Sequence, residues 1–214
     1  SYKLEHLKGV RFVVKILGIS GSPRKAATYY VVQEALKAAE SVGDVQTKFI
    51  SLAGKKINFC IHCDRCIKEG VLYCPVSKGD VMDEIYPAFI EADAYIFGSP
   101  VYQMTTSAQL QACLNRLRPL WPLIKDGMLK KKVGGSIAVG GKRHGGQETA
   151  LATINNFYLC FSIISVSAGY QAYNGASVWS QDRKDKGAAE DVVGMETVKA
   201  LAKRVAETAK MLKK

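Results

Sequence analysis

The stretch FVVKILGISGSPR, residues 12–24, joins two patterns that together indicate the fold. Residues 12–19 are mostly apolar and rich in β-branched side chains, which favours a buried β-strand. Residues 20–24 are of types common in turns, and a helical spacing of apolar residues begins at about Ala26. A buried strand that leads through a short turn into a helix is the first part of a parallel βαβ unit.

The same alternation of strands and helices continues along the chain. We expect further strands at 45–52, 94–100, 133–139 and 162–170, and helices at 26–42, 81–92, 107–117, 147–159 and near the C-terminus. Five short buried strands predict an α/β fold with a doubly wound, five-stranded parallel sheet of flavodoxin-like order. No repeat or linker is evident, so we expect one domain over residues 1–214, with a compact cysteine-rich insertion at about 57–79.

Composition narrows the class of protein. The 214 residues are 48% hydrophobic and 23% charged, as in an ordinary globular protein with one sizeable core. No apolar run reaches the roughly 20 residues of a membrane span, and SYKLEHLKGVRF has no apolar segment typical of a secretory signal. We therefore expect a cytoplasmic protein that binds no membrane. The net charge of +11 is spread along the chain, which favours a solvated surface over a nucleic-acid site.

Four of the six cysteines form a compact group with spacings x2, x2 and x7: Cys60, Cys63, Cys66 and Cys74, the last followed by a proline. Because thiols stay reduced in the cytoplasm, such a group favours metal binding or redox chemistry. The two short spacings and the Cys-Pro pair resemble the cysteines that hold ferredoxin clusters. Structural zinc, a disulfide and thiol redox chemistry remain alternatives. We expect Cys113 and Cys160, in apolar surroundings, to be buried core residues.

Three turns follow predicted strands at the edge where such sheets bind ligands. The turn at 18–28 places hydroxyls, backbone N–H groups and a guanidinium before a helix, which suits a phosphate monoester or simply caps the helix. The turn at 98–104 is apolar and aromatic, and either packs against a flat ring or covers the core. The turn at 140–148 has paired glycines that allow the backbone to approach a ligand closely.

Together the three turns resemble the flavin site of the NADPH-dependent FMN reductase superfamily. With the cysteine insertion, the chain resembles the iron–sulfur flavoproteins of archaea and anaerobic bacteria over roughly residues 12–170. The resemblance implies a phosphate site for FMN at Ser20, Ser22, Pro23, Arg24 and Thr28. It implies flavin-ring contacts at Pro100, Val101, Tyr102, Gln103 and Met104, and a third loop at Gly140, Gly141, Gly145, Gly146 and Gln147. One departure is Ala26-Ala27, where relatives usually carry Gly, Asn or Ser.

The resemblance also implies a function. All four clustered cysteines would hold one 4Fe–4S cluster, and the protein would pass electrons from a low-potential donor such as ferredoxin through the cluster to FMN and on to an acceptor. No side chain need act as a catalytic acid or base. Relatives assemble as homodimers or homotetramers, with Tyr173 and Trp179 as possible contacts here.

Two other functions remain as alternatives. One is an NAD(P)H-dependent FMN or quinone reductase with a structural zinc site at the cysteines. The other is a redox or iron sensor that changes its partners when the cluster is lost.

Overall fold

The computed structural model describes residues 13–213, so that Phe12 of the first predicted strand lies outside the described residues. The strands form one parallel sheet in the order β2-β1-β3-β4-β5, with β6 also paired to β4. Their bounds are β1 (Val14–Ser20), β2 (Val45–Ser51), β3 (Ala94–Pro100), β4 (Val133–Gly140), β5 (Ile164–Ser165) and β6 (Ala176–Trp179). The winding reverses between β1 and β3, which confirms the predicted doubly wound, flavodoxin-like order.

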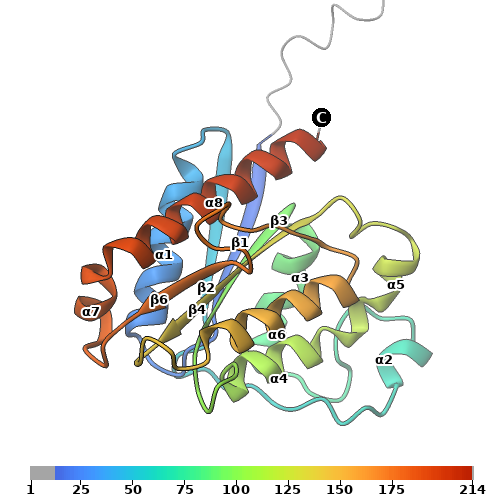
Figure 1. Ribbon diagram of the computed structural model, residues 1–214. Coiled ribbons are helices and arrows are strands. Elements are labelled where there is room, and N and C mark those ends of the chain that lie inside the picture. The colour runs from blue at the N-terminus through green and yellow to red at the C-terminus, as the bar shows by residue number, and fades with distance from the viewer. Residues whose placement is uncertain (1–12, 214) are drawn as a thin grey trace, which may run out of the picture.

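Helices cover both faces of the sheet (Figure 1). On one face lie α1 (Ala27–Glu40), α7 (Lys184–Glu190) and α8 (Val192–Lys213). On the other lie α3 (Met82–Glu91), α4 (Ala108–Arg116), α5 (Trp121–Lys125) and α6 (Gln147–Cys160), while the short α2 (Arg65–Lys68) belongs to the cysteine segment. Each face encloses its own apolar core, because the central strands β3 and β4 are buried on both sides. Among the described helices, none is both long enough and apolar enough to cross a bilayer.

The fifth strand position differs from the prediction. In place of one strand at 162–170, two short strands share the edge of β4: β5 pairs with its first residues and β6 with its last. Gly169 and Gly175, both at positive φ, turn the intervening segment away from the sheet and back. From the turn-forming residues at 173–187 we would expect a loop, but this segment contains β6 and the start of α7.

The cysteine segment is a loop that is closed at its base. Lys56 O accepts from Val81 N at 3.1 Å, and Asn58 Nδ2 donates to Ser77 Oγ at 2.6 Å. Asp80 Oδ2 accepts from Asn58 N at 3.0 Å. These bonds join the two ends of the segment and leave the cysteines on the loop between them.

A buried arginine holds this base against α4. The guanidinium of Arg116 donates to Asn58 O at 3.1 Å, to Ser77 O at 3.0 Å and to Asp80 Oδ2 at 2.8 Å. The side chains of Arg116 and Asp80 are 1% and 0% exposed. Burial alone would raise the pKa of Asp80, but hydrogen bonds from Arg116 and from the N–H groups of Asn58 and Met82 hold it below its ordinary value. The ion pair therefore stays charged inside the protein.

A half-buried cation, Lys132, lies at the opposite end of the sheet from the three turns. Lys132 Nζ donates to Ile90 O at 2.6 Å and to Ala92 O at 2.5 Å, and so satisfies carbonyls at the end of α3. Burial lowers the pKa of Lys132 to about 8, although nearby Asp93 acts in the opposite direction.

We predict that Asp80→Ala destabilises the protein by about 3–5 kcal/mol, because it leaves the buried Arg116 charge unpaired. Denaturant unfolding followed by circular dichroism measures the change. Glu91→Ala is the matched control, since Glu91 pairs with Lys15 at 3.6 Å on the exposed surface, and its loss should cost less than about 1 kcal/mol. Equal losses in the two variants would contradict a structural role for the buried pair.

We predict that stability contains a Lys132 contribution that rises with pH from about 8 to 10.5. In this window the unfolded chain binds the Lys132 proton more tightly than the folded chain does, so the free energy of unfolding increases with pH. Unfolding of Lys132→Met at a series of pH values should lack this contribution, whereas Lys131→Met, at the exposed neighbouring position, should keep it. A slope unaltered in Lys132→Met would show that the pKa of Lys132 in the folded protein is not lowered.

Candidate functional site

The three turns singled out in the sequence lie together at the carboxyl end of the sheet. β1, β3 and β4 are neighbours in it, and the chain continues their pairing beyond the strand ends. Gly21 N donates to Gly98 O at 2.8 Å, and Val101 N donates to Val139 O at 2.9 Å. The residues predicted to bind FMN therefore come from one contiguous edge, although their contacts with FMN stay a prediction.

The first turn presents hydroxyls and an uncapped helix. Ser20, Ser22 and Thr28 are at most 3% exposed, and the buried Ser20 Oγ has no hydrogen-bond partner within the described residues. Within the part of the chain that the structure describes, no side chain caps α1, whose N-cap position is Ala26. The first N–H groups of α1 therefore remain available, and the Ala26-Ala27 departure leaves room where a capping side chain would otherwise stand. An unpaired buried hydroxyl beside such a helix end fits a bound phosphate.

The first and second turns are connected by side chains. Arg24 Nη2 donates to Tyr102 Oη at 3.4 Å. Ser107 Oγ donates to Gly21 O at 2.5 Å and accepts from Leu110 N at 3.1 Å, which makes it the N-cap of α4. The sequence reading identified Ser107 only as the start of a helix. Its N-cap pattern signals the capping role, but the bond to Gly21 joins residues far apart in the sequence and leaves no local pattern.

The second turn is a strained hairpin. Tyr102 and Thr105 exchange two backbone hydrogen bonds at 2.9 and 3.0 Å. The two residues between them, Gln103 and Met104, have φ values of +48° and +62°. Glycine or asparagine usually occupies such positions, so their conformation is held by the surroundings. Met104 is 61% exposed and projects from the edge where the three turns meet.

The third turn packs directly on this hairpin. Gly146 has a φ of +104°, and a Cβ added to it would lie 2.5 Å from the Cα of Met104. Only glycine fits, both for its conformation and for the close approach. Gln147 uses its side-chain amide within the turn: Oε1 accepts from Gly145 N at 2.8 Å and Nε2 donates to Lys142 O at 2.6 Å. Gln147 therefore shapes the loop, and its contact with FMN stays a prediction.

The segment around β6 supports the third turn from behind. Trp179 Nε1 donates to Gly141 O at 3.0 Å, and the guanidinium of Arg143 lies 4.3 Å from the centre of the Trp179 ring. Ser180 N donates to Gly140 O at 2.8 Å. Trp179, one of the two aromatic residues considered for subunit contacts, thus holds its own chain's loop. The other, Tyr173, is 82% exposed.

The four clustered cysteines line one cavity of about 300 Å³ in the cysteine segment. Cys66 is buried, Cys60 and Cys74 are half-buried and Cys63 is exposed. Among the described residues, no three His, Cys, Asp or Glu side chains stand close enough to share a single metal ion. A 4Fe–4S cluster binds each cysteine through a different iron, so it suits four thiols spread around one cavity.

In this cavity both the backbone conformation around Cys63 and the pKa of the Cys66 thiol depart from their ordinary values. His62 and Asp64, on either side of Cys63, have φ values of +54° and +58°, so the backbone around Cys63 is strained. Burial raises the pKa of the Cys66 thiol, and neighbouring Cys74 and Cys60 raise it further, while Arg118 acts against them. The sequence reading missed Arg118, which lines this cavity and bonds to Asp64.

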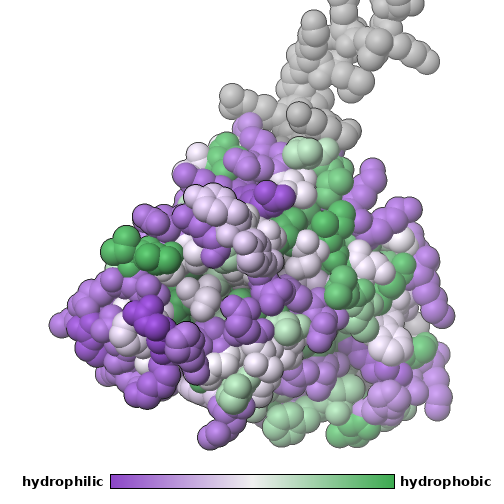
Figure 2. Space-filling model, in the orientation of Figure 1, coloured by the Kyte–Doolittle hydropathy of each residue, from purple (hydrophilic) through white to green (hydrophobic). Residues whose placement is uncertain are grey.

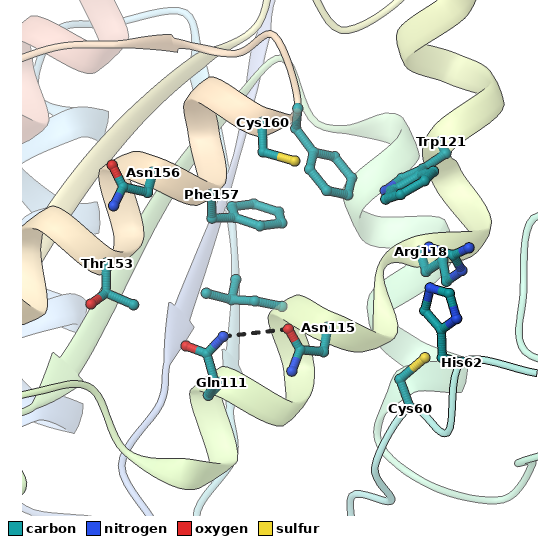
Figure 3. Close-up of a pocket in the computed structure, with 12 residues that line it drawn as sticks. Cys60, His62, Gln111, Asn115, Arg118, Trp121, Thr153, Asn156, Phe157 and Cys160 are labelled. Atoms are coloured by element: carbon teal, nitrogen blue, oxygen red, sulfur yellow. Dashed lines mark hydrogen bonds between the residues drawn. The ribbon is translucent and has the colours of Figure 1, made fainter.

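A second cavity, of about 510 Å³, opens between α4, α6 and the cysteine segment (Figure 3). Cys60 and Arg118 line both cavities, so the two share a wall. Cys160 at the end of α6 also faces this second cavity and is exposed, so the prediction that it is a core residue was wrong. The last turn of α6 buries Phe157 and Tyr158 in the core, while Cys160 on the same turn faces the cavity. Cys113 is fully buried, as predicted.

Comparisons with known proteins agree with this geometry. A family model described as NADPH-dependent FMN reductase matches residues 14–177. An iron–sulfur flavoprotein of Methanocaldococcus jannaschii is 44% identical over 205 residues, which cover 94% of this chain and 100% of that protein. An iron–sulfur flavoprotein of Archaeoglobus fulgidus is 42% identical over 193 residues, which cover 90% of this chain and 95% of that protein.

Solved structures share the fold at low sequence identity. A flavodoxin, WrbA-like protein from Agrobacterium tumefaciens superposes with a TM-score of 0.59 at 18% identity, covering 93% of this chain and 98% of that one. RosB with bound 8-demethyl-8-formylriboflavin-5'-phosphate gives a TM-score of 0.71 at 14% identity, covering 94% and 80%. With the sequence relatives and the family model, the conclusion is that this chain is an oxidoreductase that belongs to the NADPH-dependent FMN reductase family and, within it, to the iron–sulfur flavoproteins.

Proposed function

We propose that the protein is an electron-transfer flavoprotein of the cytoplasm, folded as one domain. It takes electrons from a low-potential donor such as ferredoxin and delivers them to an acceptor by way of a 4Fe–4S cluster and FMN. When bound, the cluster exchanges electrons singly while FMN takes one or two, which lets the protein couple one-electron donors to two-electron acceptors. The observation that carries the proposal is the single cavity lined by Cys60, Cys63, Cys66 and Cys74 in a chain that also presents the three turns.

The chain's own groups fit FMN. The unpaired Ser20 Oγ, the buried Ser22 and Thr28, and the open N-terminus of α1 would hold the phosphate, with Arg24 nearby to offset its charge. The hairpin at 102–105 and the third turn would border the ring, because both lie at the same edge. The net charge of +11 suits a chain that binds two negatively charged cofactors.

The surface around the cysteines supports docking of a protein donor. Exposed apolar side chains surround the cavity, and Figure 2 shows hydrophobic residues gathered at the lower right, where Figure 1 places α2 and the cysteine segment. The most exposed of them are Phe59 and Ile61, at 72% and 71%. The exposed Lys68 and Lys78 of the same segment would attract an acidic partner such as a ferredoxin, whereas Arg65 is paired with Glu69 at 2.9 Å. A homodimer or homotetramer would use part of the same apolar surface.

Anaerobic purification followed by absorption spectroscopy and metal analysis tests the proposal. We expect flavin bands with a broad shoulder, and about four irons and four sulfides per chain. The family model favours one alternative, a reductase that takes hydride directly from NAD(P)H and uses the cysteines for structural zinc. Zinc without iron, together with rapid flavin bleaching by NADPH, would replace the proposal with this alternative.

We predict that Cys63→Ala abolishes reduction of the protein by a one-electron donor and lowers its iron content, while FMN stays bound. Cys63 is exposed, so its replacement removes a cluster ligand without opening a cavity in the core. Stopped-flow reduction and iron assays measure the two effects. Cys160→Ala is the matched control, because Cys160 is also exposed but does not line the cysteine cavity. Donor-driven reduction that continues unchanged in Cys63→Ala would refute the cluster as the point of electron entry.

We predict that Gly146→Ala lowers FMN affinity by about tenfold or more, because the new Cβ meets the Met104 Cα and pushes the third turn off the hairpin. Fluorescence titration of the apoprotein with FMN measures the affinity. Gly43→Ala is the control, since Gly43 also has a positive φ, of +80°, but nothing lies within 4 Å of an added Cβ. Both variants should lose roughly 1 kcal/mol of stability through backbone strain. An equal loss of FMN affinity in Gly146→Ala and Gly43→Ala would show that backbone strain alone causes the loss.

A further inference from the structure

A charged pair in the wall of the cysteine cavity has no part in the roles described above. Among the described residues that line this cavity, those of charged types are Asp64, Arg116 and Arg118. Arg116 is bonded to Asp80 and to carbonyls at the base of the loop, so its charge serves the fold. Arg118 and Asp64 form the second pair, which joins parts of the chain 54 residues apart at the cavity itself.

Contacts on two sides hold the side chain of Arg118 in place. This residue begins a short 3₁₀ helix, Arg118–Leu120, that follows α4. Its Nε donates to Asp64 Oδ1 at 3.0 Å, and its Nη2 donates to the same oxygen. Its guanidinium lies 4.3 Å from the centre of the Trp121 ring, and Figure 3 shows both on the same side of the cavity between α4 and α6 as Cys60. These contacts leave the guanidinium little freedom to turn away from the cysteines.

Asp64 connects this arginine to the segment between two of the cysteines. It follows Cys63 directly and precedes Cys66 by two residues. Its carbonyl oxygen accepts from Ile67 N at 3.1 Å and from Lys68 N at 2.9 Å, which forms the first turn of α2 with Cys66 on it. The ion pair therefore positions this segment and also places two opposite charges in the cavity wall.

Solvent screens the two charges unequally. The side chain of Arg118 is 14% exposed and that of Asp64 is 39% exposed, so water weakens the field of the carboxylate more than that of the guanidinium. Apolar residues make up much of the remaining wall, among them Pro75, Val76 and Pro119. The positive charge therefore prevails inside the cavity. It is also permanent, because arginine keeps its proton at every pH at which proteins are ordinarily studied.

We propose that Arg118 raises the reduction potential of the iron–sulfur cluster that the four cysteines hold. One electron from the donor adds one negative charge to the cluster and its thiolates, and a cation in a wall of low dielectric stabilises that added charge. Asp64 acts in the opposite direction and keeps the guanidinium in place as its hydrogen-bond acceptor. This role of Arg118 rests on the proposed function, because it requires the cluster to occupy the cavity lined by the four cysteines.

Redox titration of the anaerobically purified holoprotein, with the reduced cluster followed by electron paramagnetic resonance, tests this role. Arg118→Met keeps an unbranched side chain without the charge. It should lower the equilibrium constant for reduction of the cluster about tenfold, which corresponds to about 59 mV for one electron. A cluster potential in Arg118→Met equal to that of the wild type would overturn the proposal.

Asp64→Asn gives the opposite sign. It keeps an oxygen that can accept from Arg118 and removes the negative charge, so the cluster potential should rise. The rise should be smaller than the fall in Arg118→Met, because Asp64 is the more exposed partner. Shifts of the two variants in the same direction would show a disturbance of the loop in place of an effect of charge, and would overturn the proposal.

Two further variants serve as controls. Arg65→Met removes a cation of the same segment that is 59% exposed and lines neither cavity, and it should leave the cluster potential nearly unchanged. Arg118→Lys keeps the charge and should stay closer to the wild-type potential than Arg118→Met does. Equal shifts in Arg65→Met and Arg118→Met would assign the effect to the total charge of the protein and overturn the proposal.

Iron and sulfide assays on the same samples separate two kinds of failure. Wild-type protein without iron contradicts the proposed function. Wild-type protein that holds the cluster, with a potential that Arg118→Met does not lower, contradicts the role of Arg118 alone. If Arg118→Met loses its iron, Asp64→Asn decides: a raised potential supports the role of the pair, and an unchanged or lowered potential overturns it.

Discussion

The ion pair between Arg116 and Asp80 is the interaction on which the arrangement of the cysteine segment depends. A charge without contact to solvent is unfavourable unless it is paired and hydrogen-bonded, and here two backbone carbonyls and a carboxylate accept from the guanidinium. The same guanidinium contacts residues before and after the cysteines, so one side chain on α4 fixes both ends of the loop. The shape of the cysteine cavity therefore follows from a contact that is not itself a ligand.

At the carboxyl edge of the sheet, a few contacts likewise fix the positions of all three turns. Ser107 bonds to the first turn, to the second turn through Ser99 Oγ, and to the N-terminus of its own helix. The third turn then rests on the second through Gly146 and Met104. Because each turn is positioned by its neighbour, a ligand that fits all three would meet a preformed surface, with little ordering left to cost free energy on binding.

Local sequence patterns predicted the sheet order and the positions of most elements, because strands buried on both faces and amphipathic helices have distinct periodicities. They failed at the edge of β4, where two short strands stand in place of one, and at Cys160, which is exposed although its neighbours Phe157 and Phe161 are buried. The cysteine spacing predicted the members of one cavity. No comparable pattern marked Arg116 or Arg118, since an arginine in a helix is usually a solvated surface residue. Only the ion pairs that they form in the folded protein, with Asp80 and Asp64 respectively, distinguish them.

The divided strand beside β4 has a consequence for association between chains. The edge of a parallel sheet offers unpaired N–H and C=O groups to any extended segment that approaches it. Here that edge consists of β5, with two residues, and β6, with four, and the segment between them includes a turn closed by a bond from Ala168 N to Ala172 O at 3.1 Å. No long, regular ladder is presented on this side, so strand addition and the aggregation that follows from it are disfavoured even before any cofactor is bound.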